Sequence, residues 1–325
     1  MTSKSKTRHL PPGVRFRSKL LAWFDQNKRD LPWRKDRDPY RVWISEIMLQ
    51  QTRVAAVIDH YQRFLQRFPT VQKLAAAREP SVLAAWSGLG YYRRARMLHA
   101  AAKQIVDQGG SFPKNAAELL QLPGIGRYTA AAIASIAFEE PLAVVDGNVE
   151  RVLERVVGKR LNEGRMWDLA NQLLSRERPG DFNQAMMELG AIVCLPRQPK
   201  CLLCPISDMC RTQGESKGSE NGARQKKQIC YAFNHEDGSI FLVQRPPIAT
   251  LMPMMWELPQ IGPINDGAPT WLRLRHSITV TDYTVYVTKA PAPEGTAGRW
   301  IPERRLNKLP LTGLTRKILR AAQII

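Results

Sequence analysis

The pattern of apolar and polar residues divides the chain into two parts. From about Ser18 to Leu195, apolar residues recur at three- and four-residue intervals, as in VAAVIDHYQRFLQRF and VERVLERVVG. This spacing is typical of amphipathic helices. Turn signals such as Asp38-Pro39, Gly109-Gly110 and Asp146-Gly147 separate the helical segments. The pattern therefore predicts a large first domain that is all-helical.

A polar segment follows this helical region. The run RTQGESKGSENGARQKK is rich in Gly and Ser and has no apolar anchor, which is typical of a flexible linker. Beyond it, short β-rich runs such as SIFLVQR and SITVTDYTVYVTKA precede a helical stretch near LTRKILRAAQ, so a small α+β domain is expected. The predicted parts are a basic tail (1–14), a helical domain (15–211), a linker (212–228) and an α+β domain (229–325).

Composition adds a basic charge to this picture. The chain has 325 residues and 44% hydrophobic content, enough for two cores. Lys and Arg outnumber Asp and Glu by 48 to 29, which is typical of a protein with a polyanion partner. A solvated basic surface is an equal alternative from charge alone, so the motifs must decide. The longest apolar run, near Ala130 to Phe138, is too short to cross a bilayer, and the N-terminus lacks a secretory pattern. We therefore expect neither a membrane partner nor secretion.

Four of the five cysteines cluster in one short segment. Cys194, Cys201, Cys204 and Cys210 are separated by six, two and five residues. An odd cysteine count without an export signal argues against disulfides and favours a metal centre. Zinc is one alternative, but structural zinc sites usually use two Cys-x2-Cys pairs and this segment (194–210) has one. The spacing favours an iron–sulfur cluster, and the cations of the same loop favour DNA docking over electron transfer.

The segment LPGIGRYTA, residues 122–130, connects two predicted helices. Gly124 and Gly126 allow a tight turn that leaves backbone N–H groups open at the start of the second helix. Such a helix start attracts an anion, so we expect a phosphate here, bound directly or through a bridging monovalent cation. The alternative is a plain helix–turn–helix connection. The cysteine segment further along a basic chain favours phosphate binding.

Two carboxylates stand in opposed environments. Glu46 lies on a predicted helix with apolar neighbours three and four residues away, so its proton should be retained near neutral pH, as in a general acid. Asp146 precedes a predicted helix whose N-terminus favours the ionised form. Such a pair suits cleavage of a glycosidic bond. The alternatives are a surface position for Glu46 and a helix cap for Asp146, and capping is compatible with chemistry.

The hairpin and the cysteine segment, in this order, resemble the endonuclease III superfamily of helix-hairpin-helix DNA glycosylases over about residues 15–211. The strings WISEIMLQQT, GLGYY and VDGNVERVL are similar to motifs of the MutY-type adenine DNA glycosylases. The resemblance implies a mainly α glycosylase fold with a [4Fe–4S] cluster and a smaller Nudix-like α+β domain. It also implies a monomer that hydrolyses adenine from A:8-oxoguanine or A:G mispairs in double-stranded DNA, in the bacterial cytoplasm or an equivalent DNA-containing compartment.

The same resemblance assigns roles to individual residues. Glu46 would protonate adenine N7 and then help activate water. Asp146 would stabilise the sugar cation or, as a nucleophile, transiently trap it, and Tyr128 and Asn148 would orient this pair. Tyr128 stands where bifunctional relatives carry a Schiff-base lysine, so we expect a monofunctional enzyme. Residues matching the family's adenine pocket are Leu31, Trp33, Arg34 and Glu188. Residues matching the duplex wedge are Gln51, Thr52, Leu89 and Tyr91, followed by Arg93, Arg94 and Arg96 as expected phosphate contacts.

The trailing domain resembles the family's Nudix-like recognition module, with LVQRP and LMPMMWELPQ. It lacks the acidic Arg-Glu-x-x-Glu-Glu box that holds magnesium in Nudix hydrolases, so it is interpreted as a binding module for 8-oxoguanine. Many relatives carry Phe-Ser-His in the sensing loop, whereas this chain has RHSITVTDY. Ser277 and Thr279 are the expected hydrogen-bonding residues there.

Two other functions remain open from the sequence. One is a bifunctional lyase acting on oxidised pyrimidines, against which Tyr128 speaks. The other is an iron–sulfur module that binds DNA without catalysis. Loss or retention of base release on changing Glu46 separates the second from a glycosylase.

Overall fold

The computed structural model describes residues 12–215, 225–249, 251–262, 270–278 and 281–325. By their internal contacts, the residues form two compact units. Unit 1 comprises Met1–Gln51 and Gln104–Ser219, and unit 2 comprises Thr52–Lys103 and Glu220–Ile325. The boundary falls within helix α6 (Tyr92–Asp107), so four central helices group with the trailing α+β region.

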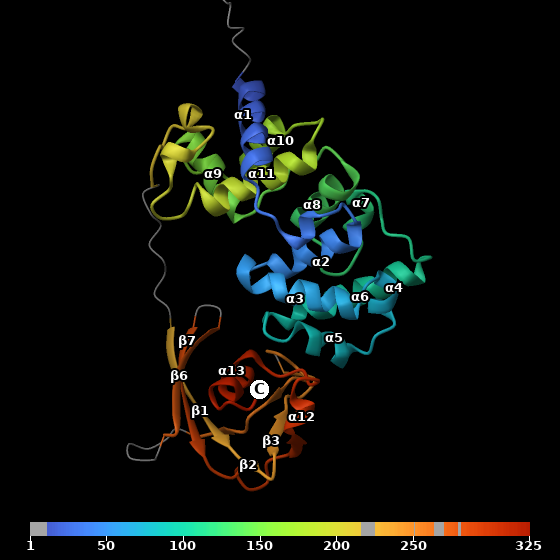
Figure 1. The fold of residues 1–325 in the computed structure, drawn as a ribbon, viewed down its shortest axis with the longest axis vertical. Helices are drawn as coiled ribbons and strands as arrows, with labels where there is room; N and C mark the ends of the chain where they lie inside the picture. The colour runs from blue at the N-terminus through green and yellow to red at the C-terminus, as the bar shows by residue number, and fades with distance from the viewer. Residues whose placement is uncertain (1–11, 216–224, 250, 263–269, 279–280) are drawn as a thin grey trace, which may run out of the picture. The chain divides into compact units, whose positions relative to one another are not determined.

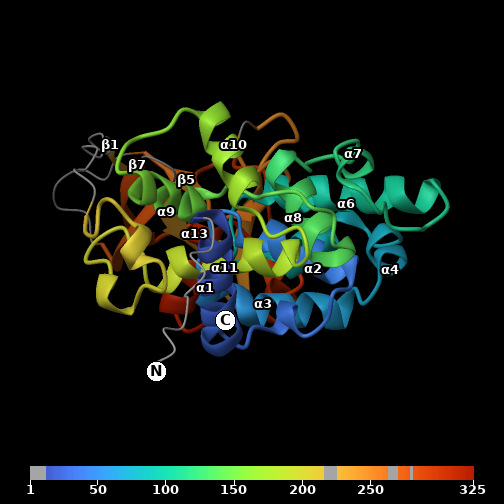
Figure 2. The ribbon, with the colours of Figure 1, turned by 90° about the horizontal axis from the view of Figure 1, so that it is seen from above.

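Unit 1 is helical throughout its described part. Its elements are α1 (Pro12–Asn27), η1 (Pro32–Arg34), α2 (Pro39–Leu49), α7 (Ala116–Leu119), α8 (Arg127–Phe138), α9 (Gly147–Val157), α10 (Glu163–Leu173), α11 (Pro179–Ile192), η2 (Cys201–Leu203) and η3 (Ser207–Met209). Figures 1 and 2 show α1 beside α11. Phe16, Leu20 and Phe24 of α1 enter one core with Phe182 and Leu189 of α11. The buried face of each helix thus carries the apolar stripe expected from the sequence.

Local signals fix where the helices of the site begin and end. Asp38 caps α2 by accepting a hydrogen bond from the Arg41 backbone N–H at 3.1 Å, and Pro39 takes the first helical position. Helix α9 ends at Gly158, whose φ of 72° is the left-handed conformation that favours glycine. The start of α2 follows the Asp38-Pro39 turn signal in the sequence.

Unit 2 combines helices with two sheets. Its helices are α3 (Val54–Arg67), α4 (Val71–Ala75), α5 (Glu79–Trp86), the first part of α6, α12 (Glu303–Leu306) and α13 (Gly313–Ala321). Its strands are β1 (Gln225–Phe233), β2 (His235–Glu236), β3 (Ser239–Gln244), β4 (Trp256–Glu257), β5 (Gln260–Ile261), β6 (Leu272–Ile278), β7 (Thr281–Lys289) and β8 (Gly298–Pro302). One sheet has the order β5-β1-β7-β6, with β1 and β7 parallel; the other joins β2, β3 and β4, with β8 also paired to β3. Helix α13 lies between the sheets (Figure 1), and its Leu314 and Ile318 share a core with both.

The predicted fold class is confirmed: a mainly helical chain with a smaller C-terminal α+β region. The predicted boundaries at 14, 211 and 228 stay predictions, and parts of the predicted tail and linker fall outside the described residues. In the portion of the chain that the structure covers, no helix combines the length and apolarity needed to cross a bilayer.

Gly180 should be sensitive to substitution, because α11 crosses α8 at this residue. A Cβ atom there would lie 2.6 Å from the Ser135 carbonyl oxygen and 2.8 Å from Ile136 Cα, both backbone atoms. We expect Gly180→Ala to lower the free energy of unfolding by about 1–3 kcal/mol. Gly164→Ala is the control, since its nearest neighbour would be 3.9 Å away, and it should change stability by less than about 1 kcal/mol. Denaturant unfolding compares them; equal stability of the two variants would contradict the close crossing.

Candidate active site and cysteine segment

Glu46 is buried on α2 and paired with Tyr128 of α8. Its side chain is 6% exposed. Tyr128 Oη donates a hydrogen bond to Glu46 Oε2 at 2.8 Å and lies 3.2 Å from Met187 Sδ. The carboxyl is therefore buried, as the sequence predicts, and the alternative of a surface position is wrong.

The surroundings of Glu46 set its proton affinity. Burial raises the pKa of Glu46 from its usual 4.5 to about 7; the Tyr128 hydrogen bond lowers it, the nearby Asp146 charge raises it, and Arg34 lowers it. A carboxyl with this pKa is partly protonated near neutral pH and can donate a proton. Burial and the two carboxylates raise the pKa of Tyr128 well above its usual value, so its phenol stays a neutral donor.

Asp146 is the N-cap of α9, as the sequence predicts. Its Oδ1 accepts hydrogen bonds from the backbone N–H groups of Asn148 at 2.9 Å and Val149 at 2.8 Å. Its Oδ2 accepts one from Asn148 Nδ2 at 2.9 Å. Asn148 therefore holds both oxygens of this carboxylate, which agrees with an orienting role.

Arg151 connects Asn148 to the cysteine segment. Its Nη2 donates to Asn148 Oδ1 at 2.8 Å and to the Gly190 carbonyl at 2.7 Å, while its Nε donates to the Cys194 carbonyl at 2.8 Å. Gly190 permits this approach, because a Cβ atom there would lie 2.5 Å from Asn148 Cβ. Sequence reasoning missed Arg151, since a link between α9 and the end of α11 leaves no local signal.

A buried charge network lies beside the predicted adenine pocket. Arg29 binds Glu188 twice, Nε to Oε1 and Nη2 to Oε2, each at 2.7 Å, and Arg34 Nη2 donates to Glu188 Oε2 at 3.0 Å. Burial alone would raise the pKa of Glu188, but the hydrogen bonds from Arg29 and Arg34 lower it to about 2. Glu188 is 1% exposed, so its visible role is to hold Arg34 in place.

Other residues of the predicted pocket take different positions. Leu31 and Trp33 are buried, at 5% and 8% exposure. Trp33 lies in η1, and Leu31 directly precedes it. Gln184, one turn before Glu188 on α11, is half-buried and accepts a hydrogen bond from Arg34 Nε at 3.1 Å. Sequence reasoning missed Gln184; its position four residues before Glu188, on the same helix face, was the available signal.

The hairpin presents an open helix start. Gly124 has a φ of 77°, which favours glycine, and Gly126 is the N-cap of α8 without a side-chain hydrogen bond. Gly126 and Arg127 are exposed, and the Arg127 guanidinium lies 3.8 Å from the centre of the Trp167 ring. This geometry suits an anion at the backbone N–H groups.

The predicted wedge residues lie in two turns. Gln51, in unit 1, has a φ of 55°. In unit 2, Tyr91 has a φ of 47° and is 45% exposed, whereas Leu89 is buried. Of the expected phosphate contacts, Arg93 is exposed, but Arg94 is half-buried and its Nη2 donates to Thr52 Oγ1.

The remaining predicted contacts are only partly visible. Arg96 donates to Glu79 and to the Pro253 carbonyl, so phosphate binding by Arg96 is not supported. In the C-terminal region, Ser277 Oγ donates to Asp282 Oδ1 at 2.6 Å. Thr279 lies outside the described residues.

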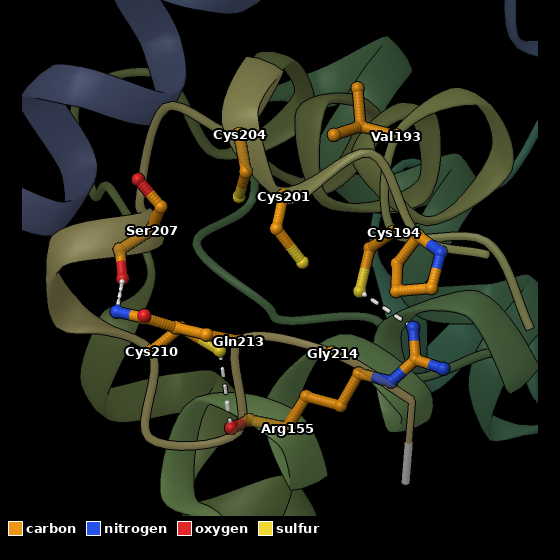
Figure 3. Close-up of a pocket in the computed structure, with 10 residues that line it drawn as sticks. Arg155, Val193, Cys194, Cys201, Cys204, Ser207, Cys210, Gln213 and Gly214 are labelled. Carbon is orange, nitrogen blue, oxygen red and sulfur yellow. Dashed lines mark hydrogen bonds between the residues drawn. The ribbon is translucent and has the colours of Figure 1, made fainter.

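The four clustered cysteines line one pocket (Figure 3). Arg155 closes one side: its Nη1 lies 3.3 Å from Cys194 Sγ and donates to the Leu195 carbonyl at 2.7 Å. Asp208 ties the segment to α1 through ion pairs with Arg15 and Lys19. The fifth cysteine, Cys230, is buried in β1.

The four thiols that line this pocket are the residues that would hold a metal centre. One zinc ion with bonds of about 2.3 Å would hold four sulfurs within about 4 Å of one another. Within the described ranges, no three Cys, His, Asp or Glu side chains are placed to hold a single ion. In an iron–sulfur cube, each thiolate binds a different iron, so the sulfurs surround a larger centre. Four cysteines around one pocket fit such a cluster.

Comparison with known proteins identifies close sequence relatives. A family model described as "HhH-GPD superfamily base excision DNA repair protein" matches residues 44–166. The chain is 54% identical to the adenine DNA glycosylase of Rattus norvegicus over 212 residues, which cover 60% of this chain and 41% of that protein. It is 40% identical to the adenine DNA glycosylase of Arabidopsis thaliana over 318 residues, which cover 82% and 50%. The chain thus spans two fifths to one half of the length of these relatives.

Solved structures share the fold. A thermostable thymine-DNA glycosylase superposes with a TM-score of 0.58 and 34% sequence identity, covering 62% of this chain and 96% of that chain. An endonuclease III in a non-covalent DNA complex superposes with a TM-score of 0.54 and 23% identity, covering 63% and 97%. At that identity, the second match shows the fold alone.

The raised pKa of Glu46 makes stability depend on pH. The unfolded chain ionises this carboxyl near its usual pKa of 4.5, whereas the folded chain keeps the proton up to about 7. The contribution of Glu46 to the free energy of unfolding is therefore highest below about pH 4.5. It falls by about 3 kcal/mol in total as the pH rises to about 7. Because glutamine cannot ionise, Glu46→Gln should be more stable than wild type by about 3 kcal/mol at about pH 8. The difference should shrink below about 1 kcal/mol at about pH 5.

Denaturant unfolding at several pH values measures this difference. Glu236→Gln, at an exposed position in β2, is the control and should show no such pH dependence. A constant difference between Glu46→Gln and wild type across the range would contradict a raised pKa.

Proposed function

We propose that this chain, which belongs to the HhH-GPD superfamily of base excision DNA repair proteins, is a monofunctional adenine DNA glycosylase acting on A:8-oxoguanine and A:G mispairs. The observation that carries the proposal is the buried Glu46, with a pKa of about 7, near the Asp146 carboxylate. The adenine DNA glycosylase names of the relatives support adenine as the base.

The two carboxyl groups divide the reaction between them. Protonated Glu46 donates its proton to N7 of an extruded adenine, so that the base leaves as a neutral molecule. The C1′–N9 bond breaks, and Asp146 stabilises the positive charge that develops on the sugar. Ionised Glu46 then accepts a proton from the water that attacks C1′. The products are free adenine and an abasic site.

Tyr128 supports hydrolysis rather than strand cleavage. A Schiff-base mechanism requires an amine next to the sugar carbon. Tyr128 instead places a phenol against Glu46, where it donates a hydrogen bond. The reaction therefore ends at the abasic site.

Cys194, Cys201, Cys204 and Cys210 are proposed to hold a [4Fe–4S] cluster. When bound, the cluster would cross-link this segment, whose regular elements are the short helices η2 and η3. Arg155, which lines the pocket, and the ion pair between Asp208 and Lys19 of α1 position this segment. The exposed Lys200 and Arg197 nearby add positive charge for a phosphate backbone.

DNA binding is assigned to the hairpin and to the C-terminal region. Gly124 and Gly126 open the start of α8 to a phosphate, with a monovalent cation as a bridge. The C-terminal α+β region is proposed as a Nudix-like module that contacts 8-oxoguanine. The enzyme is proposed to act as a monomer in a DNA-containing compartment.

A duplex panel tests the substrate. We expect single-turnover adenine release to be fastest with A opposite 8-oxoguanine, slower with A opposite G, and absent with A opposite T or thymine glycol opposite A. Alkali treatment reveals the abasic sites. Glu46→Gln should lower the rate by about a hundredfold or more, because proton donation is lost. Preference for thymine glycol would overturn the substrate assignment.

Borohydride trapping separates hydrolysis from lyase chemistry. The wild-type chain should give no covalent adduct with DNA, since Tyr128 cannot form a Schiff base. An adduct that depends on a lysine would establish the bifunctional alternative.

The metal assignment predicts the iron content of purified protein. We expect about four irons per chain and a visible charge-transfer absorbance. Cys201→Ser should reduce both, whereas Cys230→Ser, in β1, should leave both unchanged. Stoichiometric zinc without iron would contradict the cluster.

A further inference from the structure

Arg94 connects two turns of unit 2 that are far apart in the sequence. It lies in the first turn of α6, after the turn that follows α5 (Figure 1). Its Nη2 donates to Thr52 Oγ1 at 3.2 Å, to the Leu89 carbonyl at 3.3 Å and to the Gly90 carbonyl at 3.4 Å. One guanidinium therefore bridges the turn before α3 and the turn before α6.

Aromatic rings surround the same guanidinium. Its carbon lies 5.5 Å from the ring centre of the buried Trp86 and 5.3 Å from that of Tyr91. Trp86 Nε1 also donates to the Gly90 carbonyl at 3.1 Å. Tyr91 is 45% exposed, so Arg94 supports the inner side of a ring that faces outward.

The turn that carries Tyr91 has a strained backbone. Gly88 and Gly90 have φ angles of 108° and 69°, and Tyr91 has a φ of 47°. A tyrosine in the left-handed region is strained and persists only where its surroundings hold it. The hydrogen bonds of Arg94 to Leu89 and Gly90 are part of what holds it.

Arg94 differs in this respect from its neighbour Arg93, which is exposed. Burial lowers the pKa of Arg94 to about 10, so it remains charged at neutral pH while largely removed from water. Its charge is used inside the protein, on carbonyl oxygens and aromatic rings. The sequence interpretation of Arg94 as a phosphate contact is therefore replaced by an internal role.

We propose that Arg94 is a positioning residue that fixes the Thr52 turn and the Leu89–Tyr91 turn as one rigid wedge for the DNA duplex. This inference rests on the proposed function, because a wedge is needed where a base is extruded. A wedge that is already ordered before binding fills the gap without a further loss of conformational entropy. Arg94 thereby favours extrusion of the base while leaving the chemistry of Glu46 untouched.

The test compares Arg94→Ala and Arg94→Lys with Lys103→Ala, at an exposed position further along α6. All are studied as full chains, with thermal unfolding as a check of folding. One readout is the single-turnover rate of adenine release at saturating enzyme, and the other is DNA affinity as a function of salt. The third is the fluorescence of 2-aminopurine beside the mispaired adenine, measured in the Glu46→Gln background, where unstacking is seen without cleavage.

We expect Arg94→Ala to lower the single-turnover rate by about tenfold or more and to weaken the rise in 2-aminopurine fluorescence on binding. The slope of log DNA affinity against log salt concentration should stay nearly unchanged. Arg94→Lys should remain impaired, because one ammonium cannot replace the planar fork. Lys103→Ala should keep the wild-type rate, because this side chain is exposed and lies away from both turns in the sequence. Thr52→Val, which removes one acceptor and is expected to fold, should lower the rate by about two- to fivefold.

Each outcome separates the inference from the function on which it rests. If the wild type releases no adenine but Arg94→Ala still suppresses unstacking, the proposed function fails and the wedge role stands. If the wild type is active and Arg94→Ala matches Lys103→Ala in rate and fluorescence, the inference is overturned. A phosphate contact would give two different results: Arg94→Lys would restore the full rate, and Arg94→Ala would reduce the slope of log DNA affinity against log salt concentration by about one. Both results together would also overturn the inference.

Discussion

The burial of one carboxyl group, Glu46, is the constraint on which the site depends. Burial raises its pKa, and the Tyr128 hydrogen bond limits that rise, so the group titrates near neutral pH. The N-termini of three helices position the groups that set this pKa. Asp38 begins α2, the glycine hairpin begins α8, which carries Tyr128, and Asp146 begins α9. The same caps that stabilise the helices therefore place the acid, its hydrogen-bond partner and the second carboxylate.

Arginines inside the protein hold this arrangement together. Arg29 supports Glu188 and thereby Arg34, Arg151 joins Asn148 to the Cys194 carbonyl, and Arg155 braces the cysteine segment. Each forms a fork to carbonyl or carboxylate oxygens, which a lysine could not reproduce. The basic side chains therefore have two roles. Some face solvent, where DNA phosphates would bind, and others stabilise the protein's own structure.

The sequence predicted those features that have local signals. Helical periodicity, the cap at Asp146, the apolar setting of Glu46 and the four cysteines each follow from residues close together in the chain. The internal roles of Arg94 and Arg151 did not, because their partners lie on other turns and the sequence shows only a charged residue. The units also differ from the sequence division, since the central helices group by contact with the trailing sheets rather than by chain order.

The central claim is that Glu46 donates the proton that releases adenine. The direct measurement is the pH dependence of the single-turnover rate on A:8-oxoguanine duplex, at saturating enzyme. The account predicts a rate that is level or rising below a pH of about 7 and falls about tenfold per unit above it, as Glu46 loses its proton. A rate that stays constant to about two units above that pH would contradict it.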